Sequence, residues 1–343
     1  MIENPCHSNG FSILHYIFFF MHLVITGGAG FIGSNLIRTL FKNDPEIIIT
    51  CIDCFDPFYS ADLLQFNIRD LKTNPGFHFL YIDIAATTNS ELCELIPGEV
   101  DVIINMAAKA GVRPSIDNPL GYLQTNIIGL QQMLDFAKEK KIKQFVFASS
   151  SSVYGVNDHY PWKENEQLLP VSPYAMSKLS GEMLGHVYSK LFGIRFIALR
   201  LFTVYGPSQR PDLAIHKFIK AMLKNEPITM YGDGNTSRDY TYVDDIVNGI
   251  IAAIHYHQSN FEIINLGNNY TVSLKELIHT IEDVTGKKAL IKQYPDQPGD
   301  VSKTFADITK AKELLGYHPQ TKLKDGIKKF YNWFLENEEL LMQ

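Results

Sequence analysis

The sequence predicts an α/β fold in which a doubly wound parallel sheet is followed by a smaller C-terminal α/β lobe. Three observations predict it. Short β-branched runs alternate with helical segments from Leu23 onward, a glycine-rich turn follows the first run, and after about residue 203 the chain divides into shorter pieces punctuated by Pro and Gly. Such alternation is typical of a parallel sheet covered by helices on both faces. A chain of 343 residues has room for two such units.

Six apolar runs are the expected strands of this sheet. They are LVIT (23–26), IIITCID (47–53), HFLYID (78–83), VDVIINMA (100–107), QFVFASS (144–150) and RFIALRL (195–201). Each is apolar almost throughout, as in strands buried on both faces. Helix signals lie between and after them. Thr88 opens a capping box with Glu91, and Ser273 opens a later helix that stops at Gly286.

Composition and charge exclude several classes of protein. Hydrophobic residues make up 45% of the chain and charged residues 20%, which excludes disordered, collagen-like and coiled-coil chains. The formal net charge is 31 minus 37, or −6, and the lysines and arginines are scattered, so no nucleic-acid partner is expected. Four cysteines in so long a chain are no disulfide framework and favour a cytoplasmic location.

The glycine-rich turn TGGAGFIG (26–33) joins the first expected strand to a helix. Gly27, Gly30 and Gly33 are spaced so that the backbone can approach a pyrophosphate at the positive N-terminal end of that helix. Asp53 ends the second strand twenty residues after Gly33, where a carboxylate binds ribose hydroxyls and repels a 2′-phosphate. No arginine follows it directly. The predicted cofactor is therefore NAD rather than NADP.

Tyr174 and Lys178 lie four residues apart, on one face of a helix expected to run to about Phe192. A tyrosine with its ordinary pKa, near 10, is a poor base at neutral pH. Lys178 and an oxidised nicotinamide ring are two positive charges that would lower that pKa. The serines 149–152 follow the fifth strand, at the edge where a substrate would be met. The alternative is that these hydroxyls only cap a turn.

Five motifs, in this order and spacing, resemble the extended short-chain dehydrogenase/reductase (NAD-dependent epimerase/dehydratase) family. They are TGGAGFIG, SSSSVYG (149–155), SPYAMSK (172–178), LRLFTVYGP (199–207) and SRDYTYVDD (237–245). Within the family, AGVR (110–113) and YGPSQRPDLA (205–214) resemble the UDP-glucuronate 4-epimerases. The resemblance covers the chain from Met21 almost to its end, and it implies a Rossmann fold, NAD and a UDP-sugar substrate.

The resemblance implies roles for single residues. Tyr174 would be the base on the sugar 4-hydroxyl, Lys178 its electrostatic partner, and Ser150 the hydrogen-bond partner of the 4-oxygen, with Ser151 as the alternative register. The implied cofactor contacts are Gly27, Gly30, Phe31, Ile32, Gly33, Asp53, Asp83, Ile84, Ala107, Ala108, Lys109, Asn126, Tyr174 and Lys178. The implied substrate contacts are Arg113, Ser150, Ser151, Thr203, Arg210, Arg238 and Asp300. No metal site is predicted.

Two positions depart from the family pattern. Asn105 stands where relatives usually carry a histidine, and Lys109 stands where they usually carry a glutamine. We interpret the first as a change behind the site, because an amide can still hydrogen-bond. Lys109 is expected near the cofactor, whose affinity it could alter. Neither position touches the Tyr174–Lys178 pair.

The family's domain plan implies three parts. Residues 1–20 are expected to lie outside the fold, because their apolar stretch lacks a preceding positive charge and is shorter than the about 20 residues that a spanning helix needs. Weak membrane association of this stretch is the alternative. Residues 21–203 would bind NAD. Residues 204–343 would mainly bind the nucleotide sugar, with elements of about 240–267 returning to the main sheet.

The resemblance favours 4-epimerisation through a 4-keto sugar that is reduced on its opposite face. The family's dehydratases and decarboxylases share the ketone but carry carboxylates where Ser151 and Ser152 stand, so they are one alternative. Arg113 and Arg210 favour a uronic acid, because guanidinium groups pair with carboxylates, and UDP-glucuronate and UDP-galacturonate are the expected pair. If both arginines are instead surface residues in ordinary ion pairs, a UDP-hexose or UDP-N-acetylhexosamine epimerase is the other alternative.

The expected partners are the UDP-sugar and a second copy of the chain, without membrane attachment. By analogy with the family, the helix around 126–130 and the helix from Tyr174 would form a four-helix dimer contact. Apolar helix faces are more often part of an intramolecular core, which is the alternative. An alternative of a different functional class is a non-catalytic module that senses NAD and keeps the same fold.

Overall fold

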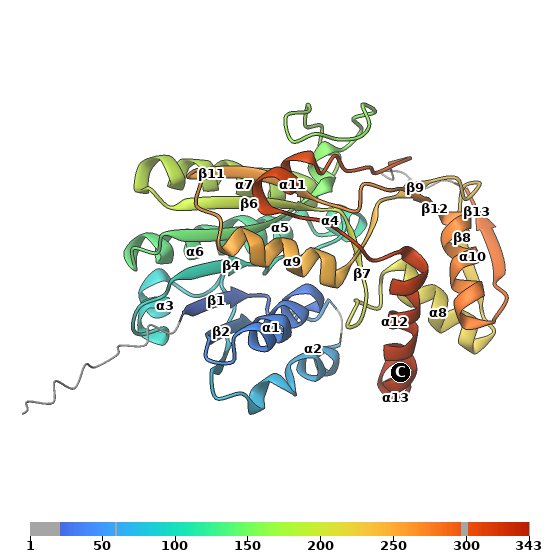
Figure 1. Cartoon of the computed structure of the whole chain (residues 1–343), viewed down its shortest axis with the longest axis horizontal. Helices are drawn as coiled ribbons and strands as arrows, with labels where there is room; N and C mark the ends of the chain where they lie inside the picture. Colours follow the sequence, from blue (N-terminus) through green and yellow to red (C-terminus); the bar gives the residue numbers. More distant parts are fainter. Residues whose placement is uncertain (1–20, 59, 296–300, 343) are drawn as a thin grey trace, which may run out of the picture.

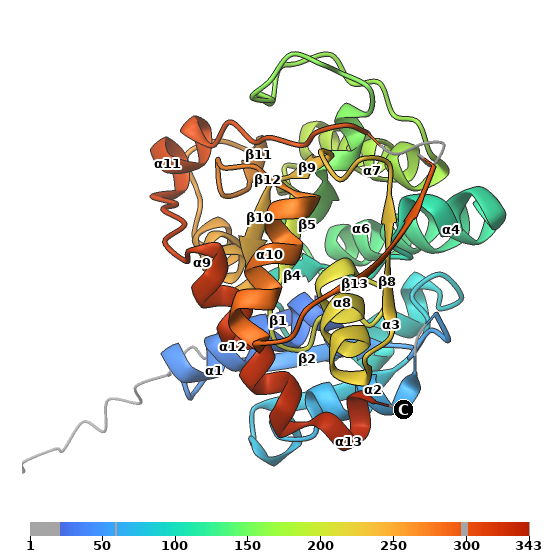
Figure 2. The ribbon, with the colours of Figure 1, turned by 90° about the vertical axis from the view of Figure 1, so that its right-hand side faces the viewer.

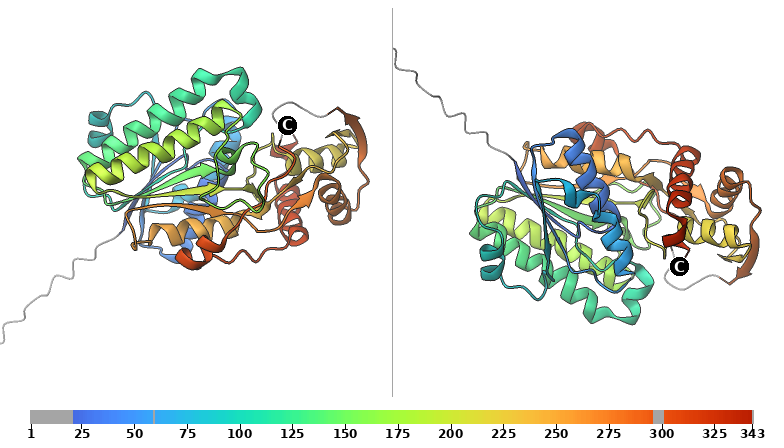
Figure 3. Two further views of the ribbon diagram at one scale, coloured as in Figure 1. Left: turned by 90° about the horizontal axis from the view of Figure 1, so that it is seen from above. Right: turned by 90° about the horizontal axis from the view of Figure 1, so that it is seen from below.

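A computed structural model describes residues 21–58, 60–295 and 301–342. Its centre is a parallel sheet of seven strands in the order β11-β6-β5-β4-β1-β2-β3, with helices on both faces (Figures 1 and 3). The strands are β1 (His22–Thr26), β2 (Ile48–Asp53), β3 (Phe77–Tyr81), β4 (Val102–Asn105), β5 (Gln144–Ser150), β6 (Arg195–Leu201) and β11 (Phe261–Leu266). The strand order reverses direction at β1, as in doubly wound sheets. The predicted fold class is confirmed.

Each face of the sheet has its own apolar core. Leu23 and Ile25 belong to one cluster of buried side chains, whereas Val24, between them, belongs to the other, and none of the three is exposed. Side chains alternate between the faces of a strand, so a strand covered on both faces must be apolar at successive positions. This is the physical reason for the continuous apolar runs in the sequence.

Helices from distant parts of the chain cover the two faces. One face carries α1 (Phe31–Asn43), α2 (Ala61–Ile68) and α9 (Val243–Ile254), and the other carries α3 (Asn89–Leu95), α6 (Gly129–Glu139) and α7 (Pro173–Phe192). Shorter helices α4 (Val112–Asp117) and α5 (Pro119–Leu123) precede α6 along the chain. The predicted capping box is present, since Thr88 accepts from the backbone N–H of Glu91 and the Glu91 carboxylate accepts from that of Thr88.

The third and fourth strands are shorter than predicted. β3 ends at Tyr81 rather than residue 83, because Asp83 turns the chain: its carboxylate accepts from the N–H of Ala85 at 2.9 Å. β4 ends at Asn105 rather than residue 107, where the N–H of Ala107 bonds to the Thr26 hydroxyl at 3.2 Å. Polar side chains therefore stop both strands at the edge of the sheet where the site lies. The predicted bounds of β5 and β6 are correct.

A second lobe stands beside the carboxyl ends of the strands (Figure 2). Its strand β8 (Pro227–Tyr231) pairs in parallel with β13 (Leu290–Tyr294), and helices α8 (Ala214–Lys224), α10 (Leu274–Thr285) and α12 (Leu323–Glu336) pack nearby. The remaining elements are β7 (Thr203–Tyr205), β9 (Ser237–Arg238), β10 (Tyr240–Tyr242), β12 (Val272–Ser273), α11 (Thr309–Leu315) and α13 (Glu338–Leu341). Between them the chain returns to the central sheet as α9 and β11.

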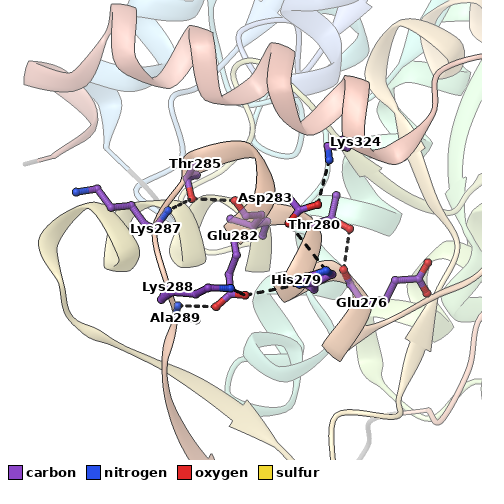
Figure 4. Close-up of polar contacts among 11 residues, drawn as sticks. Glu276, His279, Thr280, Glu282, Asp283, Thr285, Lys287, Lys288, Ala289 and Lys324 are labelled. Atoms are coloured by element: carbon purple, nitrogen blue, oxygen red, sulfur yellow. Dashed lines mark hydrogen bonds and ion pairs between the residues drawn. The ribbon is translucent and has the colours of Figure 1, made fainter.

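Helix α10 is bounded and tied by polar contacts (Figure 4). Ser273 caps its start and Gly286, with a left-handed backbone, ends it, as predicted. Its last turns bear Glu282 and Asp283, and the ammonium of Lys324 in α12 lies 3.0 Å from the Asp283 carboxylate. This exposed pair joins two lobe helices and contributes little to stability.

No helix within residues 21–58, 60–295 and 301–342 has the length and apolar character needed to cross a membrane. The expected N-terminal extension, 1–20, lies outside the described residues.

Candidate active site

A cavity of about 510 Å³ opens at the carboxyl ends of the central strands, between the sheet and the second lobe. This is the size range of small-molecule sites, at the place where doubly wound sheets bind ligands. Most of the predicted site residues line it: Gly27, Gly30, Phe31, Ile32, Gly33, Asp53, Asp83, Ile84, Ala107, Ala108, Lys109, Ser150, Ser151, Tyr174, Lys178, Thr203 and Arg210. Arg113, Asn126 and Arg238 are described but do not line it, and Asp300 lies outside the described residues.

The glycine turn is shaped as a cradle that larger residues would fill. Gly27 has a φ of +68°, and a Cβ there would lie 2.7 Å from the backbone nitrogen of Ala107. A Cβ on Gly33 would lie 2.4 Å from the carbonyl oxygen of Gly27. Helix α1 begins just after Gly30 without a side-chain cap, so its first N–H groups face the cavity side of the turn. These features fit the pyrophosphate of a dinucleotide.

Asp53 closes the cradle from the end of β2. Its carboxylate accepts from the backbone N–H groups of Ala29, at 3.1 Å, and Phe55, at 3.0 Å. Burial raises the pKa of this carboxyl group, against the effect of those hydrogen bonds. The two bonds fix the carboxylate beside the glycine turn, where it can accept from the hydroxyls of a ribose. The chain's residues therefore fit NAD.

Lys109 lines the cavity and is fixed by two residues, one that bonds its backbone and one that pairs with its side chain. Its backbone N–H donates to the Asn126 side chain at 2.8 Å, and the Asn126 amide donates to the Lys109 carbonyl at 3.0 Å. Its ammonium group pairs with the carboxylate of Asp56. Asn126 is buried and bonds the Lys109 backbone, and its predicted contact with the cofactor stays a prediction. The Lys109–Asp56 pair could not be predicted from the sequence, since the two residues are far apart along the chain.

Tyr174, Lys178 and Ser150 meet where α7 crosses the end of β5. The Ser150 hydroxyl lies close enough to the Tyr174 phenol to oppose the rise in its pKa that burial causes. The Lys178 ammonium donates to the Ala148 carbonyl at 2.7 Å and lies 5.1 Å from the centre of the Phe147 ring. Ser150 also accepts from the backbone N–H of Ser152 at 3.2 Å, so it caps a turn as well. The phenol, the ammonium and the hydroxyl thus form one cluster on the cavity wall.

Burial shifts the pKa values of both titratable groups of this cluster. Burial raises the pKa of Tyr174, and the groups that oppose this are Ser150, by a hydrogen bond, and Arg210, by its charge. Burial lowers the pKa of Lys178 to about 7. Burial thus penalises the charged forms of both Tyr174 and Lys178, and the expectation that Lys178 and an oxidised nicotinamide together lower the pKa of Tyr174 stays a prediction. The second expected charge, on a nicotinamide ring, is not part of the chain.

Tyr122 is a buried neighbour of Tyr174 that the sequence did not indicate. Its ring meets the Tyr174 ring edge-on, with centroids 6.2 Å apart, and its hydroxyl donates to the Ala110 carbonyl at 2.9 Å. The contact restricts the Tyr174 ring from the side opposite the sheet. A single tyrosine within the short helix α5 carries no sequence signal for this contact.

The predicted substrate arginines have protein partners. Arg210 donates to both carboxylate oxygens of Asp212, from Nε at 2.9 Å and Nη2 at 2.7 Å, and lies 5.2 Å from the centre of the Phe58 ring. Arg113, on α4, lies 5.1 Å from the centre of the Tyr231 ring in the second lobe. Each arginine therefore lies near an aromatic ring: Arg210 near Phe58, and Arg113 near Tyr231. Only Arg210 of the two lines the cavity.

Arg238 was expected to grip the diphosphate. It lies on β9, which pairs with β12, and its Nη1 donates to the carbonyl of Ser237 at 2.9 Å. This places it in the second lobe, outside the cavity wall. The neighbouring segment 296–300, with the predicted nucleoside contact Asp300, lies outside the described residues.

The comparisons with known proteins agree with this geometry. A family model described as GDP-mannose 4,6 dehydratase matches residues 24–330. The UDP-glucuronate 4-epimerase of Thermodesulfobacterium geofontis is 37% identical over 93% of this chain and 98% of its own length. The chain therefore belongs to this family of extended short-chain dehydrogenases/reductases, as its motifs predicted.

Two solved structures show how far the similarity extends. The UDP-glucuronic acid 4-epimerase of Bacillus cereus, in complex with UDP-glucuronic acid and NAD, is 40% identical and superimposes with a TM-score of 0.86, over 92% of this chain and 99% of that one. The UDP-N-acetylglucosamine 4-epimerase of Methanobrevibacter ruminantium, in complex with UDP-N-acetylmuramic acid, is 30% identical, with a TM-score of 0.85 over 93% and 99%. Both are nucleotide-sugar 4-epimerases.

Proposed function

We propose that this protein is an NAD-dependent nucleotide-sugar 4-epimerase that interconverts UDP-glucuronate and UDP-galacturonate. The observation that carries the proposal is the cluster of Tyr174, Ser150 and Lys178 on the wall of the same cavity as the glycine cradle. A base and a dinucleotide site that share one cavity suit removal of a proton and a hydride from one alcohol carbon. The relatives named above carry out reactions of this class.

Each residue of the cluster has a distinct part in the reaction. When bound, NAD would supply the hydride acceptor and donor for C4, held by the glycine cradle and Asp53. Tyr174 takes the proton of the 4-hydroxyl, and Ser150 hydrogen-bonds the same oxygen and so orients it. Lys178 supplies positive charge beside the phenolate that forms. When the other face of the 4-keto sugar is reduced, Tyr174 returns the proton to the oxygen.

The residues next to Ser150 favour epimerisation over elimination. Ser151 and Ser152 line the cavity where the related dehydratases would need carboxylates. Hydroxyl groups are too weakly acidic and basic to remove a proton from C5 and protonate a leaving hydroxide. The 4-keto sugar therefore meets no catalyst for elimination at this position, and its return to an alcohol is the favoured outcome.

Arg210 supports a uronic acid as the substrate. It is the one arginine among the described cavity-lining residues, so it brings positive charge to the wall where the sugar would bind. Asp212 supplies one carboxylate, and the carboxylate of a glucuronate would supply a second. Thr203 lies on the same wall and offers a hydroxyl to the sugar.

The deciding experiment is NMR analysis of the product after incubation with UDP-glucuronate and no added reductant. UDP-galacturonate is expected, with a C4 deuterium label retained on the sugar. Loss of the label to solvent, or no isomer from any UDP-sugar, would contradict the proposal. Faster turnover of UDP-glucose or UDP-N-acetylglucosamine than of UDP-glucuronate would show that the protein is a neutral-sugar epimerase instead.

We also propose that the enzyme is a cytoplasmic homodimer. Helix α7 carries an exposed apolar row at Met183, Val187 and Leu191, which are 51%, 44% and 69% exposed. Leu120, on the neighbouring α5, is 76% exposed. Residues four apart lie on one helix face, so the row can pair with a second copy. Cys51, Cys54 and Cys93 are all free thiols, which suits a reducing compartment.

Sedimentation of the purified protein tests the dimer. Val187→Glu is expected to yield a monomer, because it places a charge in the middle of the row. Lys328→Glu, at an exposed position of α12 in the second lobe, is the matched control. A wild-type protein that sediments as a monomer at every concentration would contradict this part of the proposal.

A further inference from the structure

A third residue of α7 continues the contacts that Tyr174 and Lys178 make with the end of β5. Glu182 follows Lys178 by four residues and is completely buried. Its Oε1 accepts from the Ser149 hydroxyl at 2.6 Å. Tyr174, Lys178 and Glu182 are one turn apart on the helix, and their partners are three consecutive residues, 148–150, of one strand. We call this row of contacts the β5–α7 seam.

A buried arginine completes the seam. Arg200, on the neighbouring strand β6, donates to both oxygens of Glu182, from Nε at 2.9 Å and Nη2 at 2.8 Å. The side chains of Arg200 and Glu182 are 1% and 0% exposed. The Nη1 atom of Arg200 donates to the Glu164 carbonyl at 3.2 Å, and its guanidinium lies 4.8 Å from the centre of the Tyr154 ring. Every oxygen of the Glu182 carboxylate therefore has a fixed donor.

Two glycines let the helix come this close to the sheet. A Cβ on Gly181 would lie 2.5 Å from the Phe147 ring, and a Cβ on Gly185 would lie 2.1 Å from the Phe196 ring. Both residues are next to the seam on the sheet-facing side of α7. The close approach brings the short Ser149 hydroxyl within reach of Glu182, and it excludes water from the ion pair.

The cost of burial indicates that the ion pair does more than fill space. Removing two charges from water is unfavourable, and apolar residues of similar volume often stabilise a core equally well or better. Apolar residues at these positions could not accept a hydrogen bond from the Ser149 hydroxyl. That hydroxyl lies between Ala148, which accepts from Lys178, and Ser150, which bonds to Tyr174. The Glu182–Arg200 pair therefore fixes Ser149, and the residues on either side of Ser149 contact Lys178 and Tyr174.

Resting on the proposed epimerase function, we propose that Glu182 and Arg200 are positioning residues that act through Ser149. They fix the register between β5 and α7, so that Ser150 meets the Tyr174 hydroxyl while Lys178 reaches the end of the same strand. Neither residue touches the cavity, so their effect on the reaction is transmitted through the seam.

Ser149→Ala tests this directly, because it removes the grip on β5 and leaves the Glu182–Arg200 pair intact. Truncation of Glu182 or Arg200 is less informative, because it leaves an unpaired buried charge that unfolds the protein. Ser149→Thr keeps the hydroxyl and is the rescue variant. Ser180→Ala, which removes a hydroxyl from α7 away from the strand, is the matched control.

Two readouts separate positioning from stability. For Ser149→Ala we expect kcat at neutral pH to fall about tenfold with KM for UDP-glucuronate unchanged, and the pH at which Tyr174 ionises to rise by about one unit, since one unit changes the phenolate fraction tenfold. That ionisation is measured as the phenolate absorbance that Tyr174→Phe lacks. Ser149→Thr and Ser180→Ala should behave like the wild type.

The proposal is overturned if Ser149→Ala keeps the wild-type kcat and the wild-type ionisation of Tyr174. It is also overturned if activity falls only in proportion to the fraction of folded protein. A wild-type protein that epimerises no UDP-sugar would instead refute the proposed function. In that case the absorbance titration of Tyr174 in Ser149→Ala and the wild type still decides whether the seam positions the phenol.

Discussion

The β5–α7 seam and the loop that carries Arg210 hold their side chains in different ways. In the seam, the paired side chains of Arg200 and Glu182 are 1% and 0% exposed. Arg200 lies on strand β6, Glu182 lies on helix α7, and Glu182 also bonds Ser149 on strand β5. On the loop, the paired side chains of Arg210 and Asp212 are 16% and 34% exposed, two residues apart in the chain. The groups proposed for chemistry are thus fixed by the core, whereas the group proposed for sugar choice is held by local contacts. Rigid elements hold a geometry closely, and loops change more readily.

The largest effect is expected at the reacting end of the seam. Tyr174→Phe should lower kcat about 10²–10⁴-fold, because it removes the proposed base while keeping the ring packed against Tyr122. The bound NAD content and the melting temperature should stay near those of the wild type. Kinetics together with cofactor content checks this, and a kcat above one tenth of the wild-type value would place the base elsewhere.

On the loop, a change should alter substrate choice rather than the chemistry. Arg210→Ala is expected to raise KM for UDP-glucuronate about 10–100-fold, because a hydrogen bond to a charged group is lost. It should lower kcat for a neutral UDP-sugar by much less, because the Arg210 charge acts on the Tyr174 pKa only from a distance. Arg113→Ala, outside the cavity wall, is the matched control and should have a smaller effect. Equal losses with charged and neutral sugars would mean that Arg210 supports the fold rather than the substrate.

The seam should also give the protein a pH-dependent stability that the loop does not. The pKa of Lys178 is lowered by burial from 10.5 to about 7, so the unfolded chain binds more protons between these values. The free energy of unfolding should therefore rise with pH above about 7, by up to about 1.4 kcal/mol per pH unit from this group.

Denaturant unfolding at several pH values between 7 and 9 measures this slope. Lys178→Met lacks the titrating group, so its slope should be smaller than that of the wild type by the contribution of Lys178. Identical slopes for the two proteins would show that Lys178 keeps an ordinary pKa in the folded state.

The smallest effect is expected for the exposed partner on the loop. Asp212→Asn removes the negative charge that pairs with Arg210 and should lower KM for UDP-glucuronate up to about fivefold, because the substrate carboxylate no longer competes with it. A partly exposed ion pair contributes at most about 1 kcal/mol, which sets this limit. Steady-state kinetics checks it. A rise in KM would mean that Asp212 orients Arg210 for the substrate instead of competing.

Local sequence signals predicted much of the fold and the cofactor side of the site. β5 and β6 have the predicted bounds, and the turn from Gly27 to Gly33 lies where its spacing placed it. Signals of this kind are local: apolar runs, glycines and caps act within a few residues. The hydrogen bonds between the Asn126 side chain and the Lys109 backbone had no such signal, because they depend on packing between distant segments.

The sequence by itself determined the strand and helix alternation, the glycine cradle and the four-residue spacing of Tyr174 and Lys178, since each depends on backbone geometry over one or two turns of chain. Only the tertiary structure decided which serine meets the phenol and that Asp56 pairs with Lys109. It also raised the pKa of Tyr174 through burial. Burial and long-range contacts set these properties, and both arise only when distant segments pack together.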